Sequence, residues 1–161
     1  MPTKHTSFEY TEYESDDELM RDEKALLQTA KQTTANAYAP YSGFLVGAAA
    51  LLVNGEIVTG TNQENASYPV GICAERVLLS TASSLFPGVG IKTIAISYNN
   101  THGESNRPVS PCGICRQTLV EFENRTHQPI RLILSGLRGK VQLIESASLL
   151  LPLSFTDDDL K

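Results

Sequence analysis

Two short stretches decide how this chain can fold: residues 71–76, GICAER, and residues 110–117, SPCGICRQ. They hold all three cysteines of the sequence, Cys73, Cys112 and Cys115. Each stretch follows a polar loop and opens a helical pattern, predicted over residues 73–84 and 112–124. Cysteines at a helix N-terminus suit metal binding, because the helix dipole there favours the thiolate form. The fold therefore needs only to bring two helix N-termini together to build a three-cysteine site.

Strands and helices alternate along the rest of the chain. A capping box at Ser15 and Glu18 predicts a helix over residues 16–37. The Asn54-Gly55 pair predicts a hairpin turn, and a short helix is expected near residues 146–151. Apolar and β-branched runs predict strands over residues 44–53, 56–59, 91–98, 130–134 and 141–144. This alternation predicts an α/β layer sandwich.

Length and composition exclude several classes of protein. The 161 residues favour one domain, residues 15–161, preceded by a polar extension over residues 1–14. A hydrophobic content of 41% excludes intrinsic disorder, and the net charge of -5 disfavours nucleic-acid binding. No apolar run reaches the ~18 residues of a membrane span, and residues 1–24 lack the apolar core of a signal peptide. We expect a cytoplasmic protein that binds neither nucleic acid nor membranes and keeps its cysteines reduced.

Three thiolates leave one coordination position open, which is the pattern of catalytic rather than structural zinc. A structural site needs a fourth protein ligand, and among the histidines only His102, in the loop before Cys112, is a candidate. A thioredoxin-like redox pair would leave residues 73–75 unexplained. Glu75, two residues from Cys73, can face an open coordination position without binding the metal. Cys-Ala-Glu followed by Pro-Cys-x-x-Cys matches the pattern of zinc-dependent base deaminases, in which the glutamate carries protons.

The sequence resembles the homotetrameric cytidine deaminases of pyrimidine salvage over residues 35–155. The matching stretches are NAYAPYSGFLVGAAALL at 36–52, TNQENASYPVGICAER at 61–76, SPCGICRQ at 110–117 and LLPLSF at 150–155. This resemblance implies a three-layer α/β/α sandwich with a central mixed sheet of about five strands. It implies hydrolytic deamination of cytidine and deoxycytidine to uridine and deoxyuridine plus ammonia. It also implies one zinc ion per subunit and a homotetramer with composite active sites.

The resemblance also assigns roles to individual positions. Cys73, Cys112 and Cys115 are expected to bind zinc, which activates a water that attacks C4 of the base. Glu75 is expected to act as the proton shuttle. The remaining matches are the Ala74 backbone at the pyrimidine edge, Asn62 and Glu64 at the ribose hydroxyls, Phe44 against the nucleoside, Tyr68 and Phe155 reaching a neighbouring subunit's site, and Arg76 hydrogen-bonded to the metal-bound sulfurs.

Two other hypotheses remain open at this point. Nucleoside-antibiotic deaminases of the blasticidin type share the Cys-Ala-Glu and Pro-Cys-x-x-Cys motifs, although the intact Asn-Gln-Glu-Asn stretch at residues 62–65 favours an ordinary ribose. A non-catalytic, zinc-stabilised interaction module is the alternative from another class. It predicts a closed site with four protein ligands, including His102, and no role for Glu75.

Overall fold

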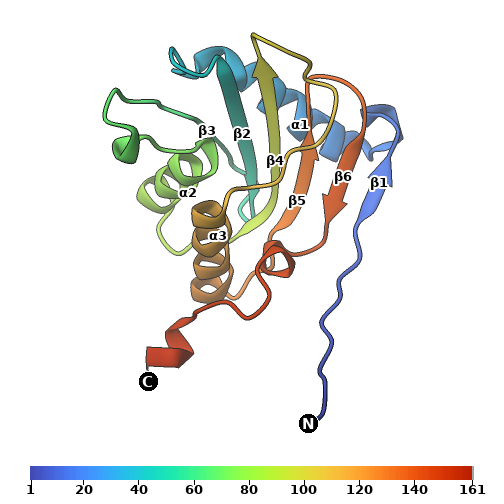
Figure 1. The fold of residues 1–161 in the computed structure, drawn as a ribbon, viewed down its shortest axis with the longest axis vertical. Coiled ribbons are helices and arrows are strands. Elements are labelled where there is room, and N and C mark those ends of the chain that lie inside the picture. The colour runs from blue at the N-terminus through green and yellow to red at the C-terminus, as the bar shows by residue number, and fades with distance from the viewer. Residues whose placement is uncertain (161) are drawn as a thin grey trace.

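The computed structural model describes residues 1–160 and shows one mixed sheet between two layers of helices (Figure 1). The sheet has six strands in the order β1-β6-β5-β4-β2-β3. The strands are β1 (Thr11–Tyr13), β2 (Phe44–Leu52), β3 (Ile57–Thr61), β4 (Ile91–Asn100), β5 (Arg131–Ser135) and β6 (Val141–Ile144). Strands β4 and β5 run parallel, and the other neighbouring pairs are antiparallel. The predicted α/β/α sandwich with a mixed sheet is confirmed.

Both faces of the sheet carry helices because both faces of its central strands are apolar. The helices are α1 (Arg21–Thr33) on one face, and α2 (Ala74–Leu85) and α3 (Gly113–Thr126) on the other (Figure 1). Successive residues of a strand point to opposite faces. Ala49 of β2 accordingly packs in a buried cluster with Leu27 of α1, whereas Ala48 packs in a second cluster with Leu78 of α2 and Leu119 of α3. Two apolar layers therefore hold the three helices on the sheet.

The prediction of a single helix over residues 16–37 is wrong. The capping box forms, because the Ser15 side chain accepts a hydrogen bond and Glu18 accepts one from the Ser15 backbone N–H at 3.3 Å. It caps only a 3-10 turn, Asp16–Glu18, and α1 begins separately at Arg21. Leu19 between them has extended backbone angles and is buried in the core beneath α1. Burial of this leucine breaks the helical pattern, and a second 3-10 turn, Thr34–Asn36, ends the segment.

The sixth strand, β1, comes from the polar extension and raises the strand count above the expected five or so. Glu12 of β1 lies opposite Gln142 of β6, accepts a hydrogen bond from its side chain at 3.1 Å, and pairs with Lys140 at 2.6 Å. Of the three residues in β1, Tyr13 alone packs against the core beneath α1. An edge strand held by charges and backbone pairing carries little apolar pattern, so the sequence gives no sign of it.

The first turn of α2 is held very close to the sheet. A Cβ added to Gly60 of β3 would lie 2.5 Å from the carbonyl oxygen of Ala74 and 2.5 Å from the amide nitrogen of Leu78. Only glycine allows this approach, and the close contact fixes where the first turn of α2 begins.

The short helix expected near residues 146–151 is a 3-10 turn, Ala147–Leu150. Within residues 1–160, no helix combines the length and the apolar character needed to cross a bilayer.

Candidate functional site

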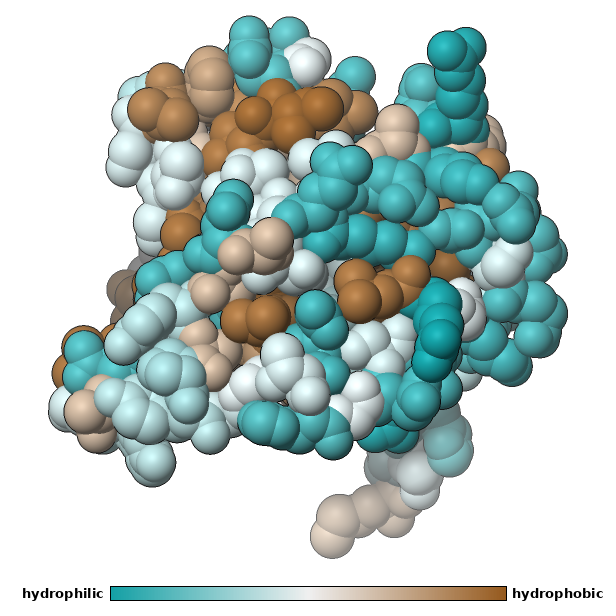
Figure 2. Space-filling view, turned by 90° about the horizontal axis from the view of Figure 1, so that it is seen from above, coloured by the Kyte–Doolittle hydropathy of each residue, from teal (hydrophilic) through white to brown (hydrophobic). Residues whose placement is uncertain are grey.

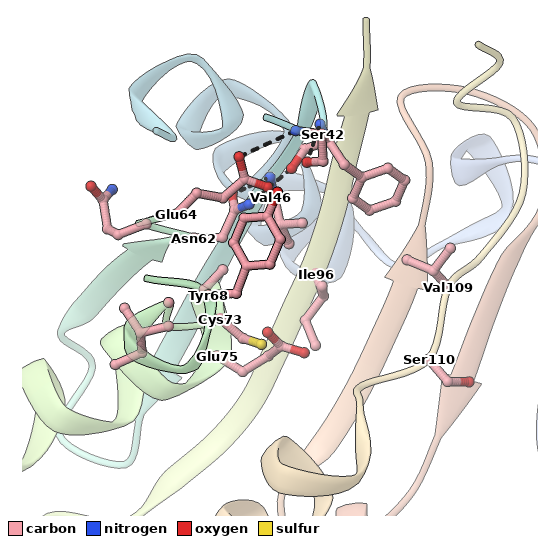
Figure 3. Close-up of a pocket in the computed structure, with 15 residues that line it drawn as sticks. Ser42, Val46, Asn62, Glu64, Tyr68, Cys73, Glu75, Ile96, Val109 and Ser110 are labelled. Atoms are coloured by element: carbon pink, nitrogen blue, oxygen red, sulfur yellow. Dashed lines mark hydrogen bonds between the residues drawn. The ribbon is translucent and has the colours of Figure 1, made fainter. Parts of the chain in front are cut away.

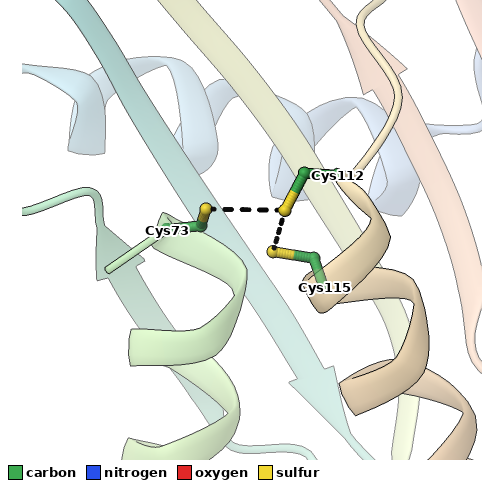
Figure 4. Close-up of side chains that lie close together, drawn as sticks. All are labelled: Cys73, Cys112 and Cys115. Atoms are coloured by element: carbon green, nitrogen blue, oxygen red, sulfur yellow. Dashed lines mark hydrogen bonds between the residues drawn. The ribbon is translucent and has the colours of Figure 1, made fainter. Parts of the chain in front are cut away.

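The three cysteines meet where the N-termini of α2 and α3 face each other (Figure 4). Cys73 is the N-cap residue of α2, Cys112 is the N-cap residue of α3, and Cys115 lies in the first turn of α3. The Sγ atoms are 3.8 Å apart for Cys73 and Cys112 and 3.5 Å apart for Cys112 and Cys115. A tetrahedral zinc ion with Zn–S bonds of ~2.3 Å holds its sulfurs ~3.8 Å apart. The cluster therefore fits one zinc ion.

The cluster offers three protein ligands and no fourth one. Among residues 1–160, the three sulfurs are the only His, Cys, Asp or Glu ligand atoms in this group, all within 4.8 Å of one another. His102 lies instead beside Gly43 at the start of β2, where a Cβ added to the glycine would be 2.6 Å from the imidazole ring. A closed four-ligand site with His102 is therefore not what the fold builds. One coordination position is left for water or substrate, as in catalytic zinc sites.

The surroundings of the cysteines favour the thiolate form of Cys73. Hydrogen bonds from Cys115 and Cys112, with the charge of Arg76 contributing, lower the pKa of Cys73 to about 6. The pKa of Cys115 is raised, because its hydrogen bond to Cys73 and its burial both stabilise the protonated thiol. Cys73 is thus the more readily ionised of Cys73 and Cys115, and a bound divalent cation would stabilise the further ionisation that full coordination requires.

Glu75 lies directly beside the cysteine cluster, inside a cleft of about 400 Å³ (Figure 3). It is the second residue of α2, and only 6% of it is exposed. Burial raises the pKa of its carboxyl group, and the nearby charge of Cys73 raises it further. A raised pKa brings a carboxyl group closer to the pH at which an enzyme works, and general acid–base catalysis is most efficient when the two are close. The position and the environment of Glu75 therefore suit a proton carrier.

Phe44 and Asn62 also line the cleft. Asn62 lies across it from Glu75 (Figure 3). The Phe44 ring stacks on Tyr98 of β4, with centroids 4.6 Å apart and planes 13° from parallel. The Asn62 side chain accepts a hydrogen bond from the Val46 N–H at 2.7 Å and donates one to the Phe44 carbonyl at 2.8 Å. Asn62 thus fixes the first residues of β2, and its amide nitrogen keeps a second hydrogen for a ligand.

Glu64 lies at the mouth of the same cleft (Figure 3). Its Oε2 atom accepts hydrogen bonds from the backbone N–H of Tyr41 at 2.9 Å and of Ser42 at 3.3 Å. A hydrogen bond from the Ser42 hydroxyl and the one from the Tyr41 backbone lower the pKa of Glu64. The carboxylate is therefore ionised and held in place. Its second oxygen can accept hydrogen bonds from hydroxyl groups.

Three of the site residues predicted from the sequence lie away from the centre of this cleft. Tyr68 lies on the rim, 76% exposed, with its ring edge-on to Tyr41 at 6.0 Å. Phe155 is 58% exposed and lies outside the cleft of its own chain, where its carbonyl accepts a hydrogen bond from Gln117 at 2.8 Å. Arg76 acts on Cys73 through its charge. It hydrogen-bonds none of the three sulfurs in the part of the chain that is described, so the expected hydrogen bond stays a prediction.

Other residues around the cleft were missed by the sequence analysis. Ile96, Val109 and Ser110 line it (Figure 3). The last two directly precede the Pro-Cys-Gly-Ile-Cys motif, so their closeness to Cys112 was available as a signal. Ile96 lies opposite Ala48 in the sheet, and no local pattern predicts that pairing.

In sequence and in structure, the chain is similar to deaminases that bind zinc. Residues 20–128 match the family described as cytidine and deoxycytidylate deaminase zinc-binding region. A cytidine deaminase of Halalkalibacterium halodurans is 39% identical over 141 residues, which cover 86% of this chain and 98% of that protein. The crystal structure of cytidine deaminase from Burkholderia pseudomallei gives a TM-score of 0.72 at 37% identity, covering 85% of this chain and 100% of that one. The structure of cytidine deaminase from Mycobacterium tuberculosis gives a TM-score of 0.65 at 35% identity, covering 83% and 97%.

Proposed function

This chain belongs to the family of zinc-dependent cytidine and deoxycytidylate deaminases, and we propose that it hydrolyses cytidine and deoxycytidine to uridine and deoxyuridine plus ammonia. The observation that carries the proposal is the buried Glu75 carboxyl beside a three-cysteine cluster with an open coordination position. Residues 15–161 are proposed to form one catalytic domain, with residues 1–14 as its extension. Because the relatives are cytidine deaminases, they favour this substrate over a nucleoside antibiotic.

Cys73, Cys112 and Cys115 would hold the zinc ion. When bound, zinc lowers the pKa of a coordinated water to ~7 and so makes it a nucleophile at neutral pH. Glu75 takes a proton from the attacking water as the bond from oxygen to C4 forms, and delivers this proton to N3. It then moves the second proton from the new hydroxyl group to the exocyclic amine. The C4–N bond breaks, ammonia leaves, and both protons of the water are accounted for in uridine and ammonia.

The rest of the cleft supports a nucleoside without a phosphate. Ala74 and Phe44 line the cleft, where the Ala74 backbone would bind the pyrimidine edge and the Phe44 ring would contact the nucleoside. The free hydrogen on Asn62 and the free oxygen of Glu64 can bind ribose hydroxyls. No Lys, Arg or His is among the described residues that line the cleft, and the Glu64 carboxylate at its mouth is ionised, as is favoured for the Cys73 thiol. A nucleotide phosphate would be repelled by these negative charges, so the chemistry favours cytidine over deoxycytidylate.

The absorbance change of cytidine on conversion to uridine tests the proposal. Zinc-loaded wild-type protein is compared with Glu75→Gln, which keeps the shape of the side chain but cannot carry the proton. General acid–base catalysis typically contributes ~10²–10⁴-fold, so the variant should lose about that factor in kcat and keep its zinc. Glu56→Gln, an exposed change in the hairpin turn, is the matched control and should be fully active. A Glu75→Gln variant with wild-type turnover would show that Glu75 is not the proton carrier.

We also propose that the active protein is a homotetramer in the cytoplasm, with each active site completed by neighbouring subunits. Apolar side chains form several separate patches on the upper end of the molecule (Figure 2). Contact with neighbouring subunits would bury such patches, which supports an assembly. Tyr68 and Phe155 are large, exposed aromatic side chains at and beyond the rim of the cleft. Cysteines that bind zinc stay reduced in the cytoplasm, which supports the location.

Complementation between two inactive variants tests the composite site. Phe155→Ala should be inactive if a neighbour needs the ring, and Glu75→Gln is inactive for its own reason. When the two are unfolded, mixed and refolded together, some sites combine Glu75 of one subunit with Phe155 of another. Activity in the mixture well above that of either variant refolded alone is the expected result. A mixture without recovered activity, or a fully active monomer in gel filtration, would contradict the composite site.

A further inference from the structure

Arg116 hydrogen-bonds the peptide groups on both sides of Cys112. Its backbone N–H donates to the Cys112 carbonyl at 2.9 Å, and its Nε–H donates to the Pro111 carbonyl at 2.8 Å. Cys112 is the exposed member of the cysteine cluster, and its side chain makes no capping hydrogen bond at the start of α3. Apart from the contacts of its sulfur with Cys73 and Cys115, Cys112 is oriented by its two flanking peptides. Arg116 binds both, one through its backbone N–H and the other through its side chain.

The same guanidinium also contacts the C-terminal part of the chain. Its Nη1 donates to the carbonyl of Leu150, the last residue of the 3-10 turn Ala147–Leu150, at 3.1 Å. The next residue on α3, Gln117, donates to the Phe155 carbonyl. Pro111 is buried, so its carbonyl has lost water and depends on a protein donor. Arginine can bind two carbonyls at once because its donors are fixed in a planar fork, which lysine lacks.

We propose that Arg116 is a positioning residue that holds Cys112 in the orientation needed to bind zinc and ties that orientation to the segment from Leu150 to Phe155. The inference rests on the proposed zinc site. If the Nε–H bond is lost, the buried Pro111 carbonyl must turn to find another donor. The peptide that carries Cys112 turns with it and takes the Cys112 sulfur away from Cys73 and Cys115.

The test is the zinc affinity of the full chain, measured by competition with a chromogenic chelator. Arg116→Lys keeps the charge and removes the fork. Changes in groups that orient metal ligands typically lower metal affinity ~10–100-fold, and a loss of at least about tenfold is expected here. Arg125→Lys is the matched control, because Arg125 lies on the same helix and contacts Ser83 and the Phe122 ring instead. Its zinc affinity should equal that of the wild type.

Thermal unfolding with and without zinc separates positioning from a merely structural role. If Arg116 positions Cys112, Arg116→Lys should shrink the rise in Tm that added zinc produces. Equal losses of Tm in both states, with unchanged zinc affinity, would overturn the inference. Arg116→Gln, which can reach one carbonyl at most, gives the same comparison if the lysine variant does not fold.

Cys112→Ser shows which claim has failed if Arg116→Lys binds zinc normally. A serine variant with weakened zinc binding keeps the proposed zinc site and overturns only the role of Arg116. A serine variant with wild-type zinc affinity overturns the site itself, and the role of Arg116 with it.

Discussion

Adding a single methyl group to Gly60 should disturb the active site by pushing α2 away from the sheet. In the Gly60→Ala variant, the new Cβ would lie 2.5 Å from the Ala74 carbonyl oxygen and from the Leu78 amide nitrogen. Atoms in good contact are ~3.5 Å apart, so α2 must move away from β3 by about 1 Å. Cys73 and Glu75 flank Ala74 and would move with it, whereas Cys112 and Cys115 stay on α3.

The cost of this shift can be measured as stability and as rate. Overpacking of this kind typically costs ~1–3 kcal/mol, and in a chain of this size each kcal/mol lowers Tm by ~2–4 °C. A catalytic group misplaced by ~1 Å can lower turnover ~100-fold. We expect Gly60→Ala to show both losses in thermal unfolding and in cytidine turnover with the zinc-loaded protein.

Gly113→Ala is the matched control, since it lies between the cysteines of α3 and a Cβ there meets no atom within 4 Å. It should keep wild-type turnover and stability. A Gly60→Ala variant with the Tm and kcat of the wild type would refute the claim that the contact between β3 and α2 positions the site.

Three further changes test other parts of the structure. Removal of zinc by a chelator should lower Tm, and added zinc should restore it, because metal binding and folding are coupled; differential scanning calorimetry measures both, and an unchanged Tm would contradict a zinc site in the fold. Glu123→Ala removes a buried carboxylate that accepts hydrogen bonds from the backbone N–H groups of Ile130 and Ala147. The free energy of unfolding, measured in urea, should fall by at least ~2 kcal/mol, and a fall below ~0.5 kcal/mol would contradict this role. Glu64→Gln should raise KM for cytidine ~10–100-fold with a smaller change in kcat, since hydrogen bonds to charged groups are worth ~1.5–3 kcal/mol; steady-state kinetics with an unchanged KM would exclude a ribose contact.

The sequence predicts the metal-binding part of the site well because its signals are local. Cys112 and Cys115 are one helical turn apart, and Cys73 and Glu75 belong to one short motif. Helix N-termini are recognisable from local patterns, and the structure places each cysteine at one. What the residue pattern could not give was the distance between the two motifs. That distance depends on how α2 and α3 pack over the sheet.

The features that sequence reasoning missed depend on contacts far apart in the chain. β1 is recognised as a strand only once β6 lies beside it, because its residues are mostly polar and exposed. The break after Glu18 depends on the burial of Leu19 against the sheet, which overrides a pattern that is helical by local rules. The role of Arg116 depends on the Leu150 carbonyl, 34 residues further along the chain.

The measurement that tests the central claim most directly is the reaction itself in ¹⁸O-labelled water. Zinc-loaded protein is incubated with cytidine, the product is identified by mass spectrometry, and ammonia is measured in the same sample. The proposed hydrolysis predicts uridine that carries one ¹⁸O atom, one ammonia for each uridine, and formation of both that is slower by ~10²–10⁴-fold with Glu75→Gln. Cytidine that is unchanged after incubation with folded protein carrying one zinc per chain would contradict the account.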